Sequence, residues 1–512
     1  MNQLRAGVVL NYVAIVLNMV IGLLYTPYLL RMLGQSEYGL YSLAASIIAY
    51  LTVLDLGFGN AIIRYTAKFR AEGKIEEQQY MFGMFFLLYL GIGVVAFIAG
   101  TILTYNVQVI FSKTMNAGEI ERTRIMLGLM TFNLAFTFPM SIWGSIMSAY
   151  ERFVFQRLVS IIRSVLNPLV MIVLLFIGYK AVALVVVTTL FNVATLIIHY
   201  WYCKRKLNIK IKFGRCKIAF LKEVSIYSFW VFLNAIMDRI YWSSGQFVLG
   251  IFCGAASIAV YAVAIQLLNM YMMFSTAISS VFLPKVTANV AQNNNEKVIS
   301  NLFIRTGRLQ YIVMALILTA FIAFGKPFIF LWAGSGYDDA YVISLLFFIP
   351  LTVPLIQNLG ITILQARNQM KFRSLLYLFI AVGSLGISIP MAKYYGGIGC
   401  AIGISSALIL GQILIMNIYY QRRQHLDIVN FWKQIFRMSF VPMLFVICYL
   451  CFHSQLDAWL ICPMNFIIGV AVFLLAYIPL FWILGLNAEE KSLILSPLRR
   501  FQKNKLHDRN NQ

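Results

Sequence analysis

The sequence predicts an all-α integral membrane protein with about 14 transmembrane helices, forming two pseudo-symmetric six-helix lobes plus two extra C-terminal helices. Of the 512 residues, 61% are hydrophobic and 12% are charged, whereas soluble proteins carry about twice that charged share. Many apolar runs are long enough to cross a bilayer as helices, and basic residues gather in alternate segments between them. These features exclude a soluble enzyme and a disordered chain, and the unbroken runs exclude a transmembrane barrel.

The predicted spans follow directly from the apolar runs. The first run follows a single basic residue, Arg5, and it is too long for the apolar region of a cleaved signal peptide. We therefore expect it to be a transmembrane helix. The fourteen runs cover approximately residues 8–30, 40–56, 80–104, 125–147, 158–177, 181–202, 224–249, 258–283, 309–331, 340–363, 375–389, 398–419, 438–452 and 461–484.

The basic residues predict how these helices are oriented. If the N-terminus is inside, 33 of the 41 Lys and Arg residues lie in inner segments, seven lie outside, and Arg239 lies within the seventh run. The inner group includes Arg163 and Arg308. Because cytoplasmic loops of membrane proteins are enriched in Lys and Arg, this asymmetry predicts that both termini are cytoplasmic. A missed helix would invert every later loop, so the split also supports the count.

Weak internal similarity predicts a duplication. With an offset of 220, Gly34, Tyr41 and Ala44 align with glycine, tyrosine and alanine at equivalent helix positions of the second half. Two such units with an even number of helices are parallel repeats. The predicted parts are an N-lobe (1–203), a basic cytoplasmic linker (204–222), a C-lobe (223–420), spans 13 and 14 (421–486) and a polybasic cytoplasmic tail (487–512).

Two inner segments are candidates for contact with the membrane surface. Residues 61–69 place Ile62, Tyr65 and Phe69 on one helix face and Arg64 and Lys68 on the other, which predicts an amphipathic helix on the inner leaflet. The polybasic tail is expected to meet anionic lipids. The alternative for both segments is a solvated loop.

Catalytic and cofactor motifs are not evident in the sequence. It shows neither a glycine-rich nucleotide loop nor paired carboxylates at a helix spacing, so we expect no enzyme activity, no cofactor and no metal. Cys448 and Cys451 form a C-x-x-C without a nearby histidine, which favours small apolar helix residues. The net charge of +23 is explained by topology, so nucleic acid is not an expected partner.

Polar residues inside the spans are the candidate site, since such residues are unfavourable in lipid and usually face the interior of the bundle. Asp238 and Arg239 are adjacent in the seventh span, and their side chains point roughly 100° apart. They predict a polar, partly cationic cavity, whereas hydrogen bonds that only join helices are the alternative. Asp238 and Asp55 are candidates for binding a coupling ion. The remaining cavity candidates are Asn234, Trp242, Gln246, Asn11, Asn18, Tyr25, Gln266 and Asn269.

Several motifs resemble a known family. They are PYLLRMLG at 27–34, EYGLY at 37–41, DLGFG at 55–59, LPK at 283–285 and QAR at 365–367. Together with the length and helix count, they resemble the Wzx-type polysaccharide-unit flippases of the multidrug/oligosaccharidyl-lipid/polysaccharide (MOP) exporter superfamily, whose fold is also that of the MATE transporters. The resemblance covers nearly the whole chain but does not identify the sugar.

The resemblance implies a flippase of the bacterial cytoplasmic (inner) membrane. Such proteins move an undecaprenyl-diphosphate-linked oligosaccharide from the cytoplasmic to the periplasmic leaflet by alternating access, for O-antigen, capsule or exopolysaccharide synthesis. Arg239 would then bind the diphosphate, with Asp238 holding it or binding a cation, and Tyr25 and Trp242 would meet the sugar. The implied partners are the lipid-linked oligosaccharide, membrane lipids and the polysaccharide polymerase of the same pathway.

Two other functions remain open at this point. A multidrug cation antiporter of the same superfamily would favour buried acids, and here the one mid-span acid is offset by its neighbour Arg239. A polysaccharide polymerase or ligase would need a large periplasmic loop, and the longest candidate loop, residues 105–123, is too short and featureless for one.

Overall fold

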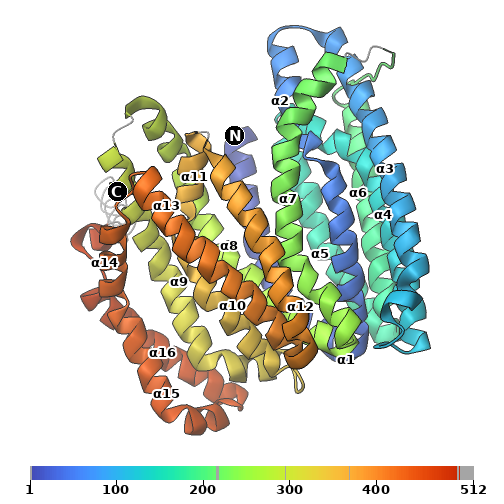
Figure 1. Cartoon of the computed structure of the whole chain (residues 1–512). Helices are drawn as coiled ribbons and strands as arrows, with labels where there is room; N and C mark the ends of the chain where they lie inside the picture. The colour runs from blue at the N-terminus through green and yellow to red at the C-terminus, as the bar shows by residue number, and fades with distance from the viewer. Residues whose placement is uncertain (1–2, 215–217, 294–295, 368, 493–494, 496–512) are drawn as a thin grey trace, which may run out of the picture. The chain divides into compact units, whose positions relative to one another are not determined.

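The computed structural model describes residues 3–214, 218–293, 296–367, 369–492 and 495, without the side chains of 3–9, 218–231, 234 and 280–293. Within these residues the regular structure is helical and contains no β-strand (Figure 1). The helices are α1 Gln3–Leu51, η1 Thr52–Asp55, α2 Phe58–Ala71, α3 Ile75–Phe111, α4 Ala117–Ala149, α5 Phe153–Ile177, α6 Ala181–Arg205, α7 Ile218–Phe252, α8 Ala255–Asn293, α9 Glu296–Ala333, α10 Asp339–Ile356, α11 Asn358–Ala366, α12 Met370–Leu408, η2 Ile409–Ile415, α13 Met416–Arg423, α14 Ile428–Met438, α15 Phe440–Leu460 and α16 Pro463–Leu484.

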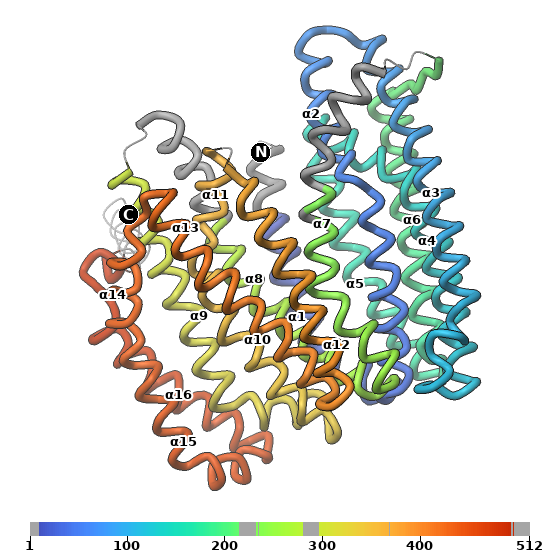
Figure 2. Tube along the Cα trace, in the orientation of Figure 1, coloured from blue at the N-terminus to red at the C-terminus, as the bar shows by residue number. Residues whose placement is uncertain are grey.

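Most of these helices are membrane spans. Eleven helical segments of the described residues are long and apolar enough to cross a bilayer. Two of them, Leu10–Ala71 and Met370–Arg423, contain a glycine with positive φ at a sharp kink, Gly34 and Gly396, so each provides two predicted crossings. Figure 2 shows the blue N-terminal tube running down and then returning toward α2. With α7, this path accounts for the fourteen predicted spans, and the all-α membrane fold is confirmed.

The helices pack as two compact units, which are described separately. Unit 1 comprises Met1–Ile265 and Tyr377–Ile404, and unit 2 comprises Gln266–Leu376 and Ser405–Gln512. Helices α1 to α7 and most of α12 therefore belong to unit 1. The lobes 1–203 and 223–420, the linker 204–222 and the parts 421–486 and 487–512 stay a prediction, because a sequence duplication is a different property from compact packing.

Part of the core of unit 1 forms beneath α2. Phe58 and Ile62 of α2 are buried among side chains of α3 and α4, including Phe85 and Tyr89. The Phe58 ring lies 6.0 Å from the Phe85 ring and 6.2 Å from the Tyr89 ring. The predicted helix around residues 61–69 is therefore present, but its placement on lipid was wrong. Its apolar face is covered by protein, because α3 and α4 extend far enough to pack against it.

Two glycines, Gly34 and Gly39, explain parts of the motifs in the first helical hairpin. Gly34 and Gly254, which the 220-residue offset aligns, have φ values of 77° and 85°, a conformation that glycine adopts without steric penalty. Gly39, in the motif EYGLY, packs against the backbone at the start of α8. A Cβ atom at residue 39 would overlap sterically with the carbonyl oxygen of Ala255. Only glycine allows the two helices to approach so closely.

A buried carboxylate joins three helices at the end of unit 1 opposite α2. Glu37 is only 4% exposed, and it forms an ion pair with Arg122 of α4. Its second oxygen accepts a hydrogen bond from the backbone nitrogen of Ala181, at 3.3 Å, where α6 begins. Because an unpaired buried charge is strongly unfavourable, these contacts fix the hairpin of α1 against α4 and α6.

In unit 2, α14, α15 and α16 pack against α9. Phe324 of α9 lies 5.5 Å, ring to ring, from Phe473 of α16, and Phe445 of α15 contacts the same ring at 5.3 Å. Helix α14 was not predicted, because residues 420–437 lie between the predicted spans 398–419 and 438–452 and their basic residues were counted with the inner segments. It is amphipathic, and it buries Ile428, Phe431, Ile435 and Met438 along one face. The last two predicted spans correspond to α15 and α16.

Candidate functional site

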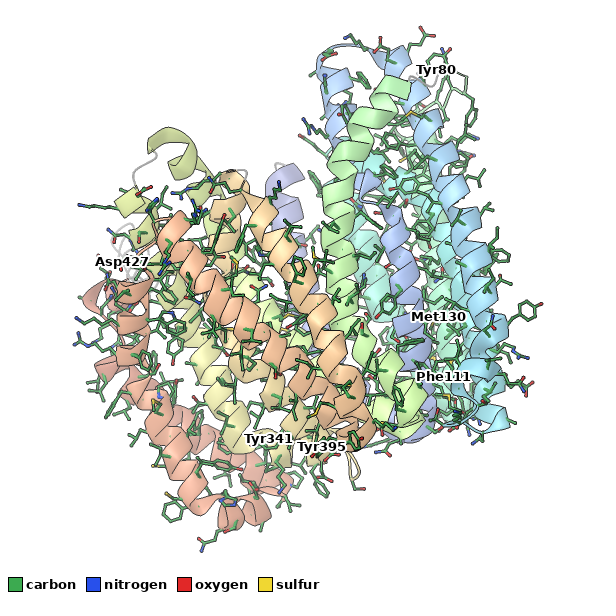
Figure 3. The ribbon with its side chains drawn as sticks, viewed as in Figure 1. Tyr80, Phe111, Met130, Tyr341, Tyr395 and Asp427 are labelled. Atoms are coloured by element: carbon green, nitrogen blue, oxygen red, sulfur yellow. The ribbon has the colours of Figure 1, made fainter. Side chains whose placement is uncertain are left out.

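A cavity of about 290 Å³ lies within unit 1. Its walls come from α1, η1, α4, α6 and α7, and one lining residue of α4, Met130, is labelled in Figure 3. The other lining residues are Tyr41, Ala45, Ile48, Ala49, Thr52, Asn133, Leu134, Thr137, Val185, Thr188, Thr189 and Arg239. The lining thus combines an apolar surface with a few hydroxyl and amide groups and one guanidinium, which is typical of ligand sites.

Arg239 brings positive charge to this cavity from the middle third of α7. Its side chain is exposed to the cavity, and within the described residues its guanidinium forms no hydrogen bond or ion pair. Neighbouring contacts hold this part of α7 in place. Tyr241 donates a hydrogen bond of 3.0 Å to the carbonyl oxygen of Ile404, and the hydroxyls of Tyr50 and Ser244 lie 2.5 Å apart. The guanidinium is therefore positioned by its helix and left available to a ligand.

A second arginine supports the cavity wall from behind. Arg163 of α5 donates a hydrogen bond of 2.9 Å to Oδ1 of Asn192 in α6. The amide nitrogen of Asn192 then donates to Oδ1 of Asn133 at 2.8 Å and to the hydroxyl of Thr137 at 2.7 Å. Asn133 and Thr137 both line the cavity. All four residues lie near the middle of their helices.

This network was not predicted from the sequence, and Arg163 was placed among the inner basic residues. The structure places it well inside α5, so that assignment was wrong. A signal was available, because Arg163 lies within the apolar run 158–177 and Asn192 lies within the run 181–202. Both should have been grouped with Arg239 as polar residues inside spans.

The other predicted cavity residues are distributed more widely. Of the ten, Arg239 lines this cavity, and the side chain of Asn234 lies outside the described residues. Asn11, Asn18 and Tyr25 are on α1, and Asp238, Trp242 and Gln246 are on α7, and none of these six is among the residues that line this cavity. Gln266 and Asn269 belong to unit 2. Their roles as cavity residues stay predictions.

Gly245 shows that one predicted face of α7 is used for packing. Gly245 follows Asn234, Asp238 and Trp242 at a spacing of three or four residues, so the four share one helix face, which would form a polar stripe on α7. In the structure Gly245 lies against the ring of Tyr261 in α8, where no side chain would fit. The stripe is therefore interrupted by a helix contact at this end.

Asp55, the second candidate for a coupling ion, has a defined partner. It lies at the end of η1, and its Oδ1 accepts a hydrogen bond of 2.9 Å from the buried hydroxyl of Tyr89 in α3. The next residues, Leu56 and Gly57, have φ values of 53° and 70° and redirect the chain into α2. The motif DLGFG is thus explained as a turn with an anchoring carboxylate, and ion binding at Asp55 stays a prediction.

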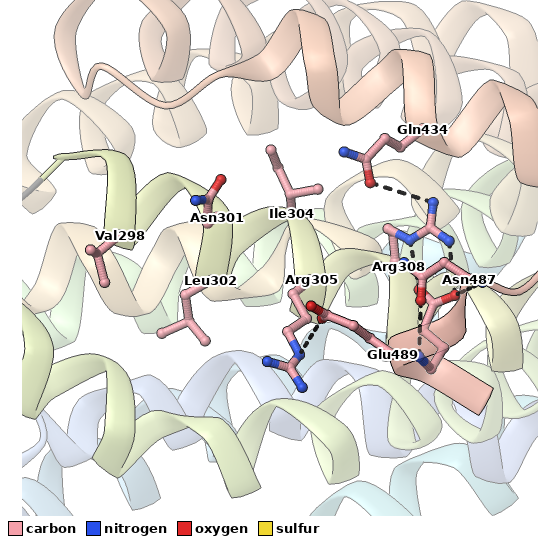
Figure 4. Close-up of a pocket in the computed structure, with 10 residues that line it drawn as sticks. Val298, Asn301, Leu302, Ile304, Arg305, Arg308, Gln434, Asn487 and Glu489 are labelled. Carbon is pink, nitrogen blue, oxygen red and sulfur yellow. Dashed lines mark hydrogen bonds and ion pairs between the residues drawn. The ribbon is translucent and has the colours of Figure 1, made fainter. Parts of the chain in front are cut away.

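A second cavity, of about 460 Å³, lies in unit 2 beside the chain that follows α16 (Figure 4). Arg308 of α9 crosses it to bind Glu490, and Gln434 of α14 accepts a further bond from Arg308 at 3.4 Å. Arg305 lies 3.8 Å from Glu489 at its rim. Its positive groups are largely paired with carboxylates, so it is a weaker candidate for an anionic ligand.

Histidine, cysteine and acidic side chains are dispersed in the part of the chain that the structure describes. There, no group of three or more His, Cys, Asp or Glu side chains is placed to hold a metal ion. Cys448 and Cys451 are both exposed free thiols on α15.

Comparison with known proteins decides the family. The model of the family described as "Polysaccharide biosynthesis protein" matches residues 4–290, more than half of the chain. The chain belongs to this family. A relative from Shigella flexneri, described as "Putative O-antigen transporter", is 19% identical over 396 residues, covering 77% of this chain and 92% of the relative. The resemblance seen in the sequence motifs is thereby confirmed.

Solved structures confirm the fold of this polysaccharide biosynthesis family member. The lipid II flippase MurJ in an inward closed conformation aligns with a TM-score of 0.70 at 15% identity, covering 96% of this chain and 99% of MurJ. An inward-facing multidrug transporter of the MATE family aligns with a TM-score of 0.58 at 16% identity, covering 82% of this chain and 99% of that one. The MATE-like transporter fold predicted from the sequence is thus established for this multi-pass membrane protein.

Proposed function

We propose that this protein is a flippase for an undecaprenyl-diphosphate-linked oligosaccharide. It would move the repeat unit from the cytoplasmic to the periplasmic leaflet of the bacterial inner membrane by alternating access, with both termini cytoplasmic. The product would enter O-antigen, capsule or exopolysaccharide synthesis, where the polysaccharide polymerase of the pathway takes it up. The observation that carries the proposal is the guanidinium of Arg239, which lines a cavity of unit 1 without a protein partner among the described residues.

The chemistry of a diphosphate matches this guanidinium. Arginine presents N–H donors in a planar fork that pairs with phosphate oxygens, and such charge-assisted bonds are roughly twice as strong as neutral ones. A charge in the middle of a membrane helix is unfavourable by about 2.5–3.5 kcal/mol on insertion scales. Its retention is explained if an anionic ligand compensates it during each transport cycle.

The cavity lining favours this substrate over a cationic drug. The charged side chain on the lining is an arginine, and none of its lining residues is acidic. An exporter that carries cations relies on acids facing its cavity. Membership of a polysaccharide biosynthesis family points in the same direction.

The proposal is tested in a deletion strain and with purified protein. Without the protein, the lipid-linked repeat unit should accumulate in the cytoplasmic leaflet while surface polysaccharide is lost, and the wild-type gene should restore both. Purified protein in liposomes should expose a lipid-linked oligosaccharide to an external glycosidase. If the deletion leaves surface polysaccharide intact, and the liposomes show no translocation, a flippase role is excluded. If those liposomes instead export an organic cation, the antiporter is correct.

A further inference from the structure

The hydrogen-bond network behind the cavity has a direction that its chemistry fixes. Arginine has N–H donors and no acceptor. Arg163 must therefore face an oxygen of Asn192, which leaves the amide nitrogen of Asn192 as the donor toward α4. Oxygen and nitrogen of an amide side chain are usually assigned from their partners, and here a permanently charged donor decides the assignment.

The orientation of Asn133 follows from that of Asn192. Asn192 uses its amide hydrogens on Oδ1 of Asn133 and the hydroxyl oxygen of Thr137. Asn133 therefore presents its oxygen to the network and keeps its amide nitrogen for other partners. The hydroxyl of Thr137 donates to the backbone oxygen of Asn133, at 2.7 Å, so its own hydrogen is already used.

The unused donor belongs to a residue of the cavity lining. Asn133 lines the cavity, and within the described residues its amide nitrogen has no acceptor. The guanidinium of Arg239 lines the same cavity. The cavity lining therefore contains two groups of hydrogen-bond donors. If the amide of Asn133 were flipped to present its oxygen to the cavity, its nitrogen would face the nitrogen of Asn192, and two donors would oppose each other.

We infer that Asn133 is a fixed hydrogen-bond donor for an acceptor oxygen of the transported headgroup, and that Arg163 is the positioning residue which sets its orientation through Asn192. This inference rests on the proposed function, since it concerns the ligand of the same cavity. The acceptor is an oxygen of either the diphosphate or the first sugars. A group with only donors, such as an ammonium, is disfavoured at this position.

The test uses full-length protein in lipid nanodiscs and two probes, undecaprenyl diphosphate without sugar and the complete lipid-linked oligosaccharide. Asn133→Asp keeps an oxygen for Asn192 but replaces the cavity donor with an acceptor, and Asn133→Ala removes the donor without adding charge. Each change should weaken binding at least about tenfold, because a buried polar contact with the ligand is left unmade. The matched control is Asn106→Asp, at an exposed position of α3 outside the cavity.

The two probes identify the acceptor. Equal weakening for both probes assigns the acceptor to the diphosphate, and weakening for the oligosaccharide alone assigns it to the sugar. Unchanged binding of both probes by Asn133→Asp and Asn133→Ala overturns the inference while leaving the flippase proposal in place. If wild-type protein binds neither probe, the flippase proposal fails and the inference falls with it.

Arg163 is tested by what it must supply. Arg163→Lys keeps a side chain that can donate but cannot accept a hydrogen bond, so this variant should retain most binding. Arg163→Gln can present an oxygen, so the amide of Asn192 would no longer be held in one orientation. Arg163→Gln should therefore weaken binding and reduce discrimination between the headgroup and a soluble ammonium competitor. A role in packing alone would be met as well by Gln as by Lys. Equal behaviour of the two variants would refute the positioning role.

Discussion

Arg308 and Glu490 form a buried bidentate ion pair, with Nε to Oε1 at 2.6 Å and Nη2 to Oε2 at 2.8 Å. Their side chains are 8% and 2% exposed. Glu490 also accepts from the backbone nitrogen of Asn487 at 2.9 Å, and Asn487 accepts from that of Glu490. This reciprocal cap and the ion pair together fix the segment after α16 onto α9.

Removing one member of this pair should destabilise unit 2 strongly. Arg308→Met leaves the carboxylate of Glu490 buried and unpaired, and we expect a loss of about 3–5 kcal/mol. Thermal unfolding in detergent should show a clearly lower Tm for the single variant than for the double variant with Glu490→Met. The control is Arg305→Met, whose pair with Glu489 is exposed and should contribute no more than about 1 kcal/mol. Equal effects of the two single changes would contradict this interpretation.

Gly39→Ala should disrupt the first helical hairpin. The added methyl group would overlap the carbonyl oxygen of Ala255, and overpacking of this kind typically destabilises by about 1–3 kcal/mol. We expect a lower yield of folded protein by fluorescence-detected gel filtration. Gly128→Ala on α4 is the matched control, because a Cβ at residue 128 meets nothing within 4 Å. A normal profile for Gly39→Ala would show that the two helices can separate without harm.

The rate of export after substitution of Arg239 should depend on both the charge and the geometry of the new side chain. Arg239→Ala is expected to abolish export, and Arg239→Lys should be partly active because it keeps the charge but loses the planar fork. Both proteins should reach the membrane in normal amounts, which immunoblotting checks. If Arg239 only balances the charge of Asp238 without binding it directly, the double change Asp238→Asn with Arg239→Gln should restore export. A fully active double variant would remove Arg239 from the binding site.

Asp55 can be tested separately as an anchor and as an ion site. Asp55→Asn keeps an oxygen that can accept from Tyr89, whereas Tyr89→Phe breaks the hydrogen bond and keeps the carboxylate. If Asp55 binds a coupling cation, Asp55→Asn should blunt the response of transport to a proton or sodium gradient, and Tyr89→Phe should not. Loss of folded protein in Tyr89→Phe with full gradient response in Asp55→Asn would identify a purely structural carboxylate.

Single cysteines should reveal the orientation of unit 1 and of the start of α12. In a variant that lacks the seven native cysteines, Lys210→Cys and Lys371→Cys should be protected from an impermeant thiol reagent in intact cells. Lys113→Cys, at the α3–α4 turn, should be labelled. These three positions are exposed in the structure, so failure to react reflects sidedness. Labelling of residue 210 or 371 from outside would contradict cytoplasmic termini.

Apolar length and basic loops were sufficient to predict the fold class, because the bilayer imposes both on any helical membrane protein. Helix ends were harder to predict. The apolar run 375–389 is shorter than a span and was expected to extend by several residues, and α12 does begin earlier, at Met370, and kinks only at Gly396. Helix α14 was missed because its basic residues resemble those of an inner loop, although its apolar residues recur at helical spacing.

The candidate site was predicted only in part. Arg239 was found because no loop could explain its charge. Arg163 was missed because it lies close enough to the basic loop after α4 to be counted with it, and its link to Asn133 depends on contacts between three helices that no spacing in one segment reveals. The role of Gly39 likewise needs its partner, Ala255, to be known.

The bonds from Asn192 also constrain how the protein can move. They join α4, α5 and α6 near the middle of these helices, as Glu37 joins α4 and α6 to the first hairpin at one end, so this wall should travel as a rigid body. A ligand shifts a conformational equilibrium only through a difference in affinity between the two states. A wall of constant shape provides little such difference. The energy that drives the cycle should therefore arise where the cavity can change, at the single charge that α7 contributes.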